Sequence, residues 1–182
     1  MRRELYLLVV VQILVASSMG IVGPIYSIYF ERISGNLKDV GLLVGVYWII
    51  VGLLEVPFGM LSDRIGKKKV FTIGGMLVSL SILLYSMVSN FKEALIVEMM
   101  GAVGYSMQMP AFYSLMAEVT RKEKRGLEVG LVDSSWNLFY GLASIISGIL
   151  VVTFGFSLIF SLASFLYFGS SILIGGKMRE IR

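Results

Sequence analysis

Residues 59–69, with the sequence GMLSDRIGKKK, separate two long apolar runs and constrain the fold of this chain more than any other segment. The segment holds an acid, a base, two glycines and three consecutive lysines, whereas the flanking runs are almost free of charge. A membrane-spanning helix needs roughly 20 mainly apolar residues. An apolar run, a short charged turn and a second apolar run therefore predict two membrane helices joined by a short loop.

The composition indicates a protein that lipid solvates. Hydrophobic residues make up 57% of the chain and charged residues 15%, with a mean hydropathy of +0.84, far from the usual soluble balance. The chain has no Cys or His, which excludes disulfide frameworks, thiol catalysis and the commonest zinc sites. No nucleotide-binding loop is present, which argues against an enzyme and an ATP-driven pump. We expect no cofactor, no metal and no catalytic residues.

Six apolar runs are long enough to span a bilayer, and the connections between them are short and polar. We predict an all-α membrane protein with a single six-helix domain over residues 1–182. The predicted spans are about 5–30, 40–61, 70–89, 93–117, 126–152 and 157–176.

The basic residues predict the orientation of these spans. Thirteen Lys and Arg residues lie in the terminal segments and in the loops at 62–69 and 118–125, whereas the opposite loops hold only Arg32, Lys38 and Lys92. Cytoplasmic loops carry the excess of Lys and Arg. We therefore expect a multi-pass protein of the cell membrane with both termini in the cytoplasm. The net charge of +4 is explained by this topology, without a nucleic-acid partner.

The pattern G-x-x-x-D-R-x-G-x-K-K in residues 59–69 resembles the loop between helices two and three of the major facilitator superfamily of secondary transporters. Residues 110–126, PAFYSLMAEVTRKEKRG, resemble the end of helix four and the following loop in that family. The resemblance covers the chain as the N-terminal six-helix half of a twelve-helix fold. It implies transport of a small solute by alternating access, with proton coupling and with export as one direction.

Two departures from the family pattern weaken a specific drug–proton antiporter assignment. Many proton-coupled members carry an Arg early in helix four, but residues 97–104 read VEMMGAVG. Drug–proton antiporters carry a Gly-Pro-x-x-Gly-Gly kink in helix five, whereas residues 144–149 read SIISGI.

The resemblance also implies that the charged loop is a conformational latch. In the family, an acid equivalent to Asp63 pairs with bases and a helix N-terminus, and these contacts break when the transporter rocks. Such placement is physically favourable for a carboxylate. The alternative is a static anchor that fixes membrane topology. The candidate latch residues are Gly59, Asp63, Arg64, Gly66, Lys67, Lys68, Glu118 and Arg125.

Three acids lie within predicted spans: Glu55, Glu98 and Asp133. An ionisable group inside a membrane is a functional hypothesis by default, and burial without a basic partner favours a neutral carboxyl group. Such a group suits a proton carrier or a docking point for a cation. A structural or interfacial role is the alternative, which we weigh most heavily for Glu98. The candidate proton, cation or substrate residues are Glu55, Asp133, Asn137, Tyr140, Gln108 and Tyr105. Further residues that could line a cavity are Gln12, Ser18, Tyr26 and Phe112.

Small residues form two stripes that predict close helix packing. One contains Gly41, Gly45, Gly52 and Gly59, and the other contains Gly141, Ser144 and Gly148. In the family, helices two and five contact the other half, so we expect these stripes to face a second six-helix unit. The partners expected are therefore the lipid bilayer, a small solute, and a second copy or a separate half. A truncated or vestigial half that acts as a membrane scaffold without transport is the alternative.

Overall fold

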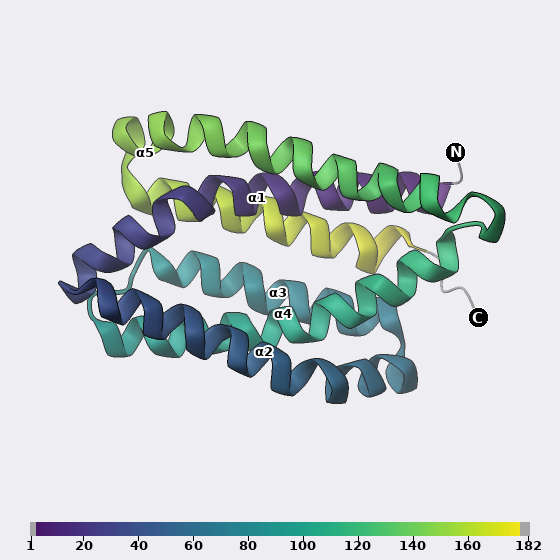
Figure 1. The fold of residues 1–182 in the computed structure, drawn as a ribbon, viewed down its shortest axis with the longest axis horizontal. Coiled ribbons are helices and arrows are strands. Elements are labelled where there is room, and N and C mark those ends of the chain that lie inside the picture. Colours follow the sequence, from purple (N-terminus) through teal and green to yellow (C-terminus); the bar gives the residue numbers. More distant parts are fainter. Residues whose placement is uncertain (1–2, 179–182) are drawn as a thin grey trace.

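The computed structural model describes residues 3–178, and these form a bundle of α-helices along one long axis, with no strand in the described part (Figure 1). A short 3-10 turn, η1 (Lys122–Lys124), precedes the last helix. The helices are α1 (Arg3–Ser34), α2 (Leu37–Ile65), α3 (Lys67–Tyr85), α4 (Phe91–Val119) and α5 (Arg125–Lys177).

A break at Gly155 divides α5 into two helical arms. The backbone there has φ 76° and ψ 171°, a conformation that side chains with a Cβ rarely adopt. The second arm turns back beside the first, so the two arms lie next to each other in Figure 1. The sequence predicted two helices, 126–152 and 157–176, and the break lies between them.

Local signals explain the ends of the other helices. Gly66, with φ 107°, separates α2 from α3, and its lack of a Cβ permits this sharp change of direction. The side chains of Asn36 and Asn90 cap α2 and α4 by accepting hydrogen bonds from the backbone N–H groups of Lys38 and Glu93, as is typical of Asn at this position.

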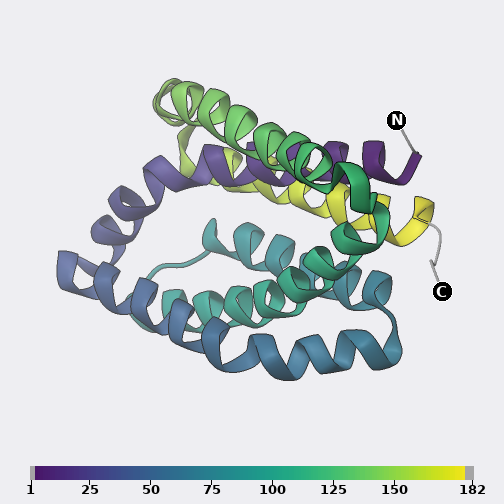
Figure 2. The ribbon, with the colours of Figure 1, turned by 45° about the vertical axis from the view of Figure 1, so that its right-hand side comes forward.

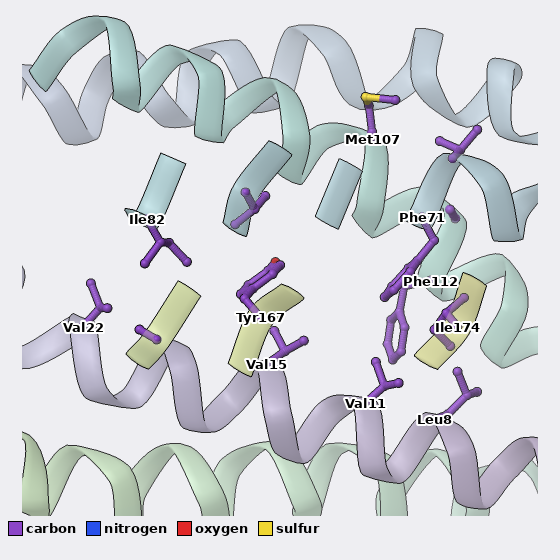
Figure 3. Close-up of a cluster of buried hydrophobic side chains, with 14 of the residues drawn as sticks. Leu8, Val11, Val15, Val22, Phe71, Ile82, Met107, Phe112, Tyr167 and Ile174 are labelled. Carbon is purple, nitrogen blue, oxygen red and sulfur yellow. The ribbon is translucent and has the colours of Figure 1, made fainter. Parts of the chain in front are cut away.

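The helices pack in two groups. Figure 2 shows α1 with both arms of α5 on one side, and α2, α3 and α4 on the other. The most extensive contacts join α1 to α5, α3 to α4 and α5, and α2 to α4. Apolar side chains fill the space between the groups, among them Val15, Phe71, Phe112, Tyr167 and Ile174 (Figure 3).

Small polar residues join the helices where the backbones approach. Ser79 on α3 and Ser164 on α5 each donate a hydrogen bond to the other's carbonyl oxygen, at 2.9 and 2.8 Å. Ser18 on α1 donates to Ala163 O at 2.7 Å. Lipid tails are as apolar as Leu, so close packing and such hydrogen bonds hold membrane helices together.

The glycines that pack within the chain differ from the predicted stripes. A Cβ at Gly74 would lie 2.6 Å from Gly104 O, so α3 and α4 touch through their backbones. At Gly41, Gly52 and Gly148, by contrast, a Cβ would meet no atom within 4 Å. The same holds for Gly45 and Gly141, while Gly59 meets only Pro110 Cβ at 3.6 Å. Apart from Gly59, the glycines of the stripes therefore face away from the bundle, whereas Ser144 donates a hydrogen bond to Gly20 O on α1 at 3.1 Å.

Within residues 3–178, four helical stretches are long and apolar enough to cross a membrane: α1, α2, α3 and Lys122–Lys177. The helix α4 is not among these stretches, and the last stretch contains both arms of α5. The six separate spans therefore remain a prediction. The ends of the bundle differ in charge. The described basic residues lie at the end where Figure 1 marks both termini, except Arg32, Lys38 and Lys92.

Candidate functional site

A cavity of about 440 Å³ lies between α1, α2, α3, α4 and the first arm of α5. Its volume falls in the range of small-molecule sites. Aromatic side chains make up much of the wall, together with Met19, Val22, Val44 and Val78. The aromatic lining residues are Tyr26, Tyr47, Trp48, Tyr85, Tyr105, Trp136 and Tyr140.

Glu98 is the only acidic or basic side chain among the described residues that line this cavity. It lies two turns into α4 and is 4% exposed. Tyr85, the last residue of α3, donates a hydrogen bond from its hydroxyl group to Glu98 Oε2 at 2.6 Å. A buried carboxylate needs such donors, because its transfer from water is otherwise costly.

Tyr26 completes this corner of the cavity from α1. Its hydroxyl group is buried and lies close enough to the Glu98 carboxylate to interact electrostatically, without the geometry of a hydrogen bond. Its ring packs edge-on against Tyr85, with centroids 6.4 Å apart. Three helices therefore bring one carboxyl group and two phenol groups together.

Two of the predicted solute residues, Tyr105 and Tyr140, line the cavity. Tyr105 packs against Trp48, with ring centroids 5.9 Å apart. Tyr140 stacks on Trp136 at 6.1 Å, with an angle of 23° between the rings. The aromatic wall thus contains one ring pair between α2 and α4, Trp48 with Tyr105, and one ring pair within α5, Trp136 with Tyr140.

Gln108, by contrast, is packed into the helix core and does not line the cavity. Tyr167 on α5 donates a hydrogen bond to Gln108 Oε1 at 2.5 Å, and Gly75 on α3 leaves room for the amide. Of the further cavity candidates, Tyr26 lines the cavity, whereas Gln12, Ser18 and Phe112 are buried elsewhere.

The structure places Glu55, Asp133 and Asn137 outside the cavity lining. Glu55 is half-buried on α2, whereas Asp133 and Asn137 are exposed on the first arm of α5. Within the described residues, no hydrogen bond or ion pair joins the side chains of Glu55 and Asp133 to another group. Sequence reasoning gave Glu98 the least weight of the three acids. The sequence near Glu98 offered one hint of this site, a Tyr at the end of the preceding apolar run. That residue, Tyr85, lies beside Glu98 only because the chain turns between α3 and α4.

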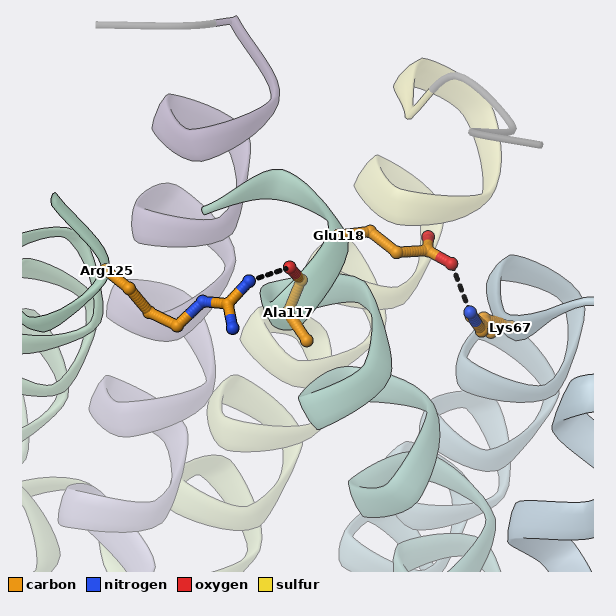
Figure 4. A network of polar contacts seen from close by, with 4 residues as sticks. All are labelled: Lys67, Ala117, Glu118 and Arg125. Atoms are coloured by element: carbon orange, nitrogen blue, oxygen red, sulfur yellow. Dashed lines mark hydrogen bonds and ion pairs between the residues drawn. The ribbon is translucent and has the colours of Figure 1, made fainter. Parts of the chain in front are cut away.

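The predicted latch residues gather at the basic end of the bundle. Figure 4 shows that Lys67, at the start of α3, forms an ion pair with Glu118, near the end of α4. Arg125 donates a hydrogen bond from its guanidinium group to Ala117 O at 3.2 Å. Lys68 donates to Met178 O at 2.9 Å. These contacts join α3, α4 and both ends of α5.

Asp63 and Arg64 take no part in these contacts. Both are exposed in the last turn of α2, and the structure pairs neither with another described residue. A second ion pair at this end joins Arg121 to Glu128 at 2.6 Å, where Glu128 also accepts from the Arg121 backbone N–H at 2.7 Å. The sequence had not singled out this pair. It closes the α4–α5 connection.

Comparison with known proteins adds a family relationship. The model of the Major Facilitator Superfamily matches residues 8–179. An uncharacterized MFS-type transporter of Methanocaldococcus jannaschii is 28% identical over 163 residues, which cover 90% of this chain and 42% of that protein. The quinolone resistance protein NorA of Staphylococcus aureus strain MRSA252 is 25% identical over 148 residues, covering 81% of this chain and 38% of that protein. The chain thus spans about two fifths of the length of these relatives.

Proposed function

The chain belongs to the major facilitator superfamily of membrane transporters, and on this premise we propose that it moves a small solute across the cell membrane by alternating access. Membership points to a transporter without enzymatic activity. The observation that carries the proposal is the cavity of about 440 Å³ between the helices, with a buried carboxyl group in an aromatic wall. A concave site with few polar groups is the usual form of a small-molecule site.

We place six spans across the membrane, with both termini in the cytoplasm. Support comes from the break at Gly155, which gives α5 two antiparallel arms, and from the basic residues at one end of the bundle. Because Lys and Arg favour the cytoplasmic side, the end that holds Lys67 and Arg125 faces the cytoplasm in this proposal.

We assign the coupling ion as a proton and the direction as export. Glu55 and Asp133 are the proposed proton carriers, because an acid within a membrane span is a candidate for function and neither has a basic partner among the described residues. The direction rests on the similarity to the quinolone resistance protein.

The contacts at the basic end suit a reversible latch. The Lys67–Glu118 pair is partly exposed, with side-chain exposures of 25% and 27%, so water can replace it at small cost. Asp63 and Arg64 are exposed and free to pair in another conformation. In this proposal they engage when the bundle rocks, while Lys67 and Glu118 hold the state described here.

The transport unit is proposed to contain two six-helix bundles. Most glycines of the stripes on α2 and α5 meet no other described residue within 4 Å, namely Gly41, Gly45, Gly52, Gly141 and Gly148, and the chain spans 42% and 38% of the two relatives. A second copy or a separate half would cover the stripes. The alternative is a truncated or vestigial half-transporter that acts as a membrane scaffold without transport.

Reconstitution separates transport from the scaffold alternative. Proteoliposomes loaded with a quinolone are given a pH gradient, and the release of the compound is compared with that from protein-free vesicles. We expect release that depends on the gradient and stops with a protonophore. Equal release from both kinds of vesicle, for this probe and for a panel of small solutes, would favour the scaffold.

A further inference from the structure

The cavity combines one buried carboxyl group, that of Glu98, with a wall of aromatic side chains. Glu98 is buried, yet neither Lys nor Arg is found among the described residues that line the cavity. Its hydrogen bond from Tyr85 leaves lone pairs on the carboxylate available. A buried carboxyl group that faces a cavity without a basic partner can be compensated by a cation from solution.

The wall selects the kind of cation. Faces of Tyr and Trp rings attract cations, and aromatic cages are the usual sites for quaternary ammonium groups. A metal ion is disfavoured, since no cluster of three or more Asp, Glu, His or Cys occurs in the part of the chain that the structure describes.

We propose that this cavity binds a monovalent alkylammonium or aromatic ammonium ion, with the cationic group between Glu98 and the rings of Tyr26 and Tyr85. Glu98 neutralises the charge, and Tyr85 is a positioning residue that fixes the carboxylate. Tyr105, Trp136 and Tyr140 contact the apolar part of the ligand. This inference names the solute class for the proposed transporter and rests on that function only in treating the cavity as the solute site.

The chain offers a direct readout, because its two Trp residues, Trp48 and Trp136, both line the cavity. Intrinsic fluorescence therefore reports occupancy without a label. The probe is phenyltrimethylammonium, and its neutral isostere tert-butylbenzene has the same shape without the charge. Binding is measured on the 182-residue chain in phosphatidylglycerol nanodiscs.

We expect the cation to bind at least tenfold more tightly than the isostere. Glu98→Gln should weaken binding of the cation about tenfold or more, as loss of a buried charge partner does, and should leave binding of the isostere within about twofold. Tyr85→Phe keeps the ring and removes the hydrogen bond, so it should weaken only the cation, severalfold. Glu31→Gln, which removes an exposed acid from α1, is the matched control and should change neither.

Retained binding of the isostere shows that a variant is folded. Equal affinity of the wild-type chain for cation and isostere, or unchanged cation binding in Glu98→Gln, would overturn the assignment. The same binding measurement in phosphatidylcholine nanodiscs identifies the source of the ammonium group. Undiminished binding of phenyltrimethylammonium indicates a soluble solute. Weaker binding, caused by competition from the lipid, indicates a choline headgroup. The binding assay does not depend on transport, so the two proposals fail separately. Transport without cation binding would reject this inference alone. Cation binding without transport would reject the proposed function alone.

Discussion

Lys67 in the first turn of α3 and Glu118 in the last turn of α4 form an ion pair at the basic end of the bundle. The two residues are separated by the whole length of α3 and α4 along the chain, and the pair ties the far ends of that hairpin together. Both side chains are partly exposed, so water screens the attraction and the contribution to stability is small.

We expect a double-mutant cycle of Lys67→Met and Glu118→Gln to give a coupling free energy of about 0.2–1 kcal/mol. Thermal unfolding in detergent, followed by circular dichroism, measures the free energy of unfolding. The exchanged pair, Lys67→Glu with Glu118→Lys, should recover part of the loss. Strictly additive single variants would show that the pair contributes nothing to the folded state.

Gly74→Ala should destabilise the bundle, because the new Cβ would lie 2.6 Å from Gly104 O and the α3 and α4 backbones would have to separate. Overpacking of this kind costs about 1–3 kcal/mol. Gly41→Ala is the control, since its Cβ meets nothing within 4 Å. The unfolding temperature of each variant is the measurement, and an equal effect of the two substitutions would contradict the close backbone contact.

Asp63→Asn should slow transport severalfold while expression and membrane insertion stay near normal. Asp63 is exposed at the end of α2, and surface substitutions away from special features change stability by less than about 0.5 kcal/mol. Initial rates in proteoliposomes test the latch. Glu123→Gln, in the exposed turn η1, is the matched control. Wild-type rates in Asp63→Asn would leave the loop as a topology anchor.

Neutralising the proposed proton carriers should separate coupling from exchange. In the double variant Asp133→Asn with Glu55→Gln, accumulation driven by a pH gradient should disappear, whereas exchange between identical solutes continues. Exchange needs no net proton movement. Gradient-driven transport that survives in the double variant would make both acids structural.

Assembly can be tested on a chain that contains no native Cys. A chain with Gly45→Cys is reconstituted with a differently tagged chain that carries Gly141→Cys, and we expect a cross-link between them. Gly169→Cys is the control, because Gly169 also meets nothing within 4 Å but lies off the stripes. Absence of the cross-link in a sample that still transports would contradict the homodimer.

Replacing Gly52 or Gly148 with Leu tests the same contact by function. A larger side chain would hold the two bundles apart, and in a symmetric dimer each substitution acts twice. We expect less dimer and less transport together. Gly169→Leu should leave both unchanged, and a similar loss in this control would point to general damage.

The sequence by itself determined the parts of this protein that depend on local chemistry. Apolar runs of bilayer length predicted the helices, and the charged turn predicted a loop at residues 62–69 between two of them. The structure extends both helices into this loop and places the break at Gly66, where a residue without a Cβ fits most easily. The pattern of residues 59–69 indicated the family that the comparison confirms. Each of these features depends on residues that are close together in the sequence, so periodicity and composition are enough to identify it.

Only the tertiary structure decided which polar groups meet. Glu98 and Tyr85 belong to different helices, and Tyr26 comes from a third, so their common corner depends on helix rotation that no local pattern specifies. The same is true of glycines. The stripes on α2 and α5 have the same spacing rules as any packed seam, yet the backbones touch at Gly74 and Gly104 instead. Which face of an apolar helix turns inward depends on the shape of its neighbours, because lipid and protein interior are equally apolar.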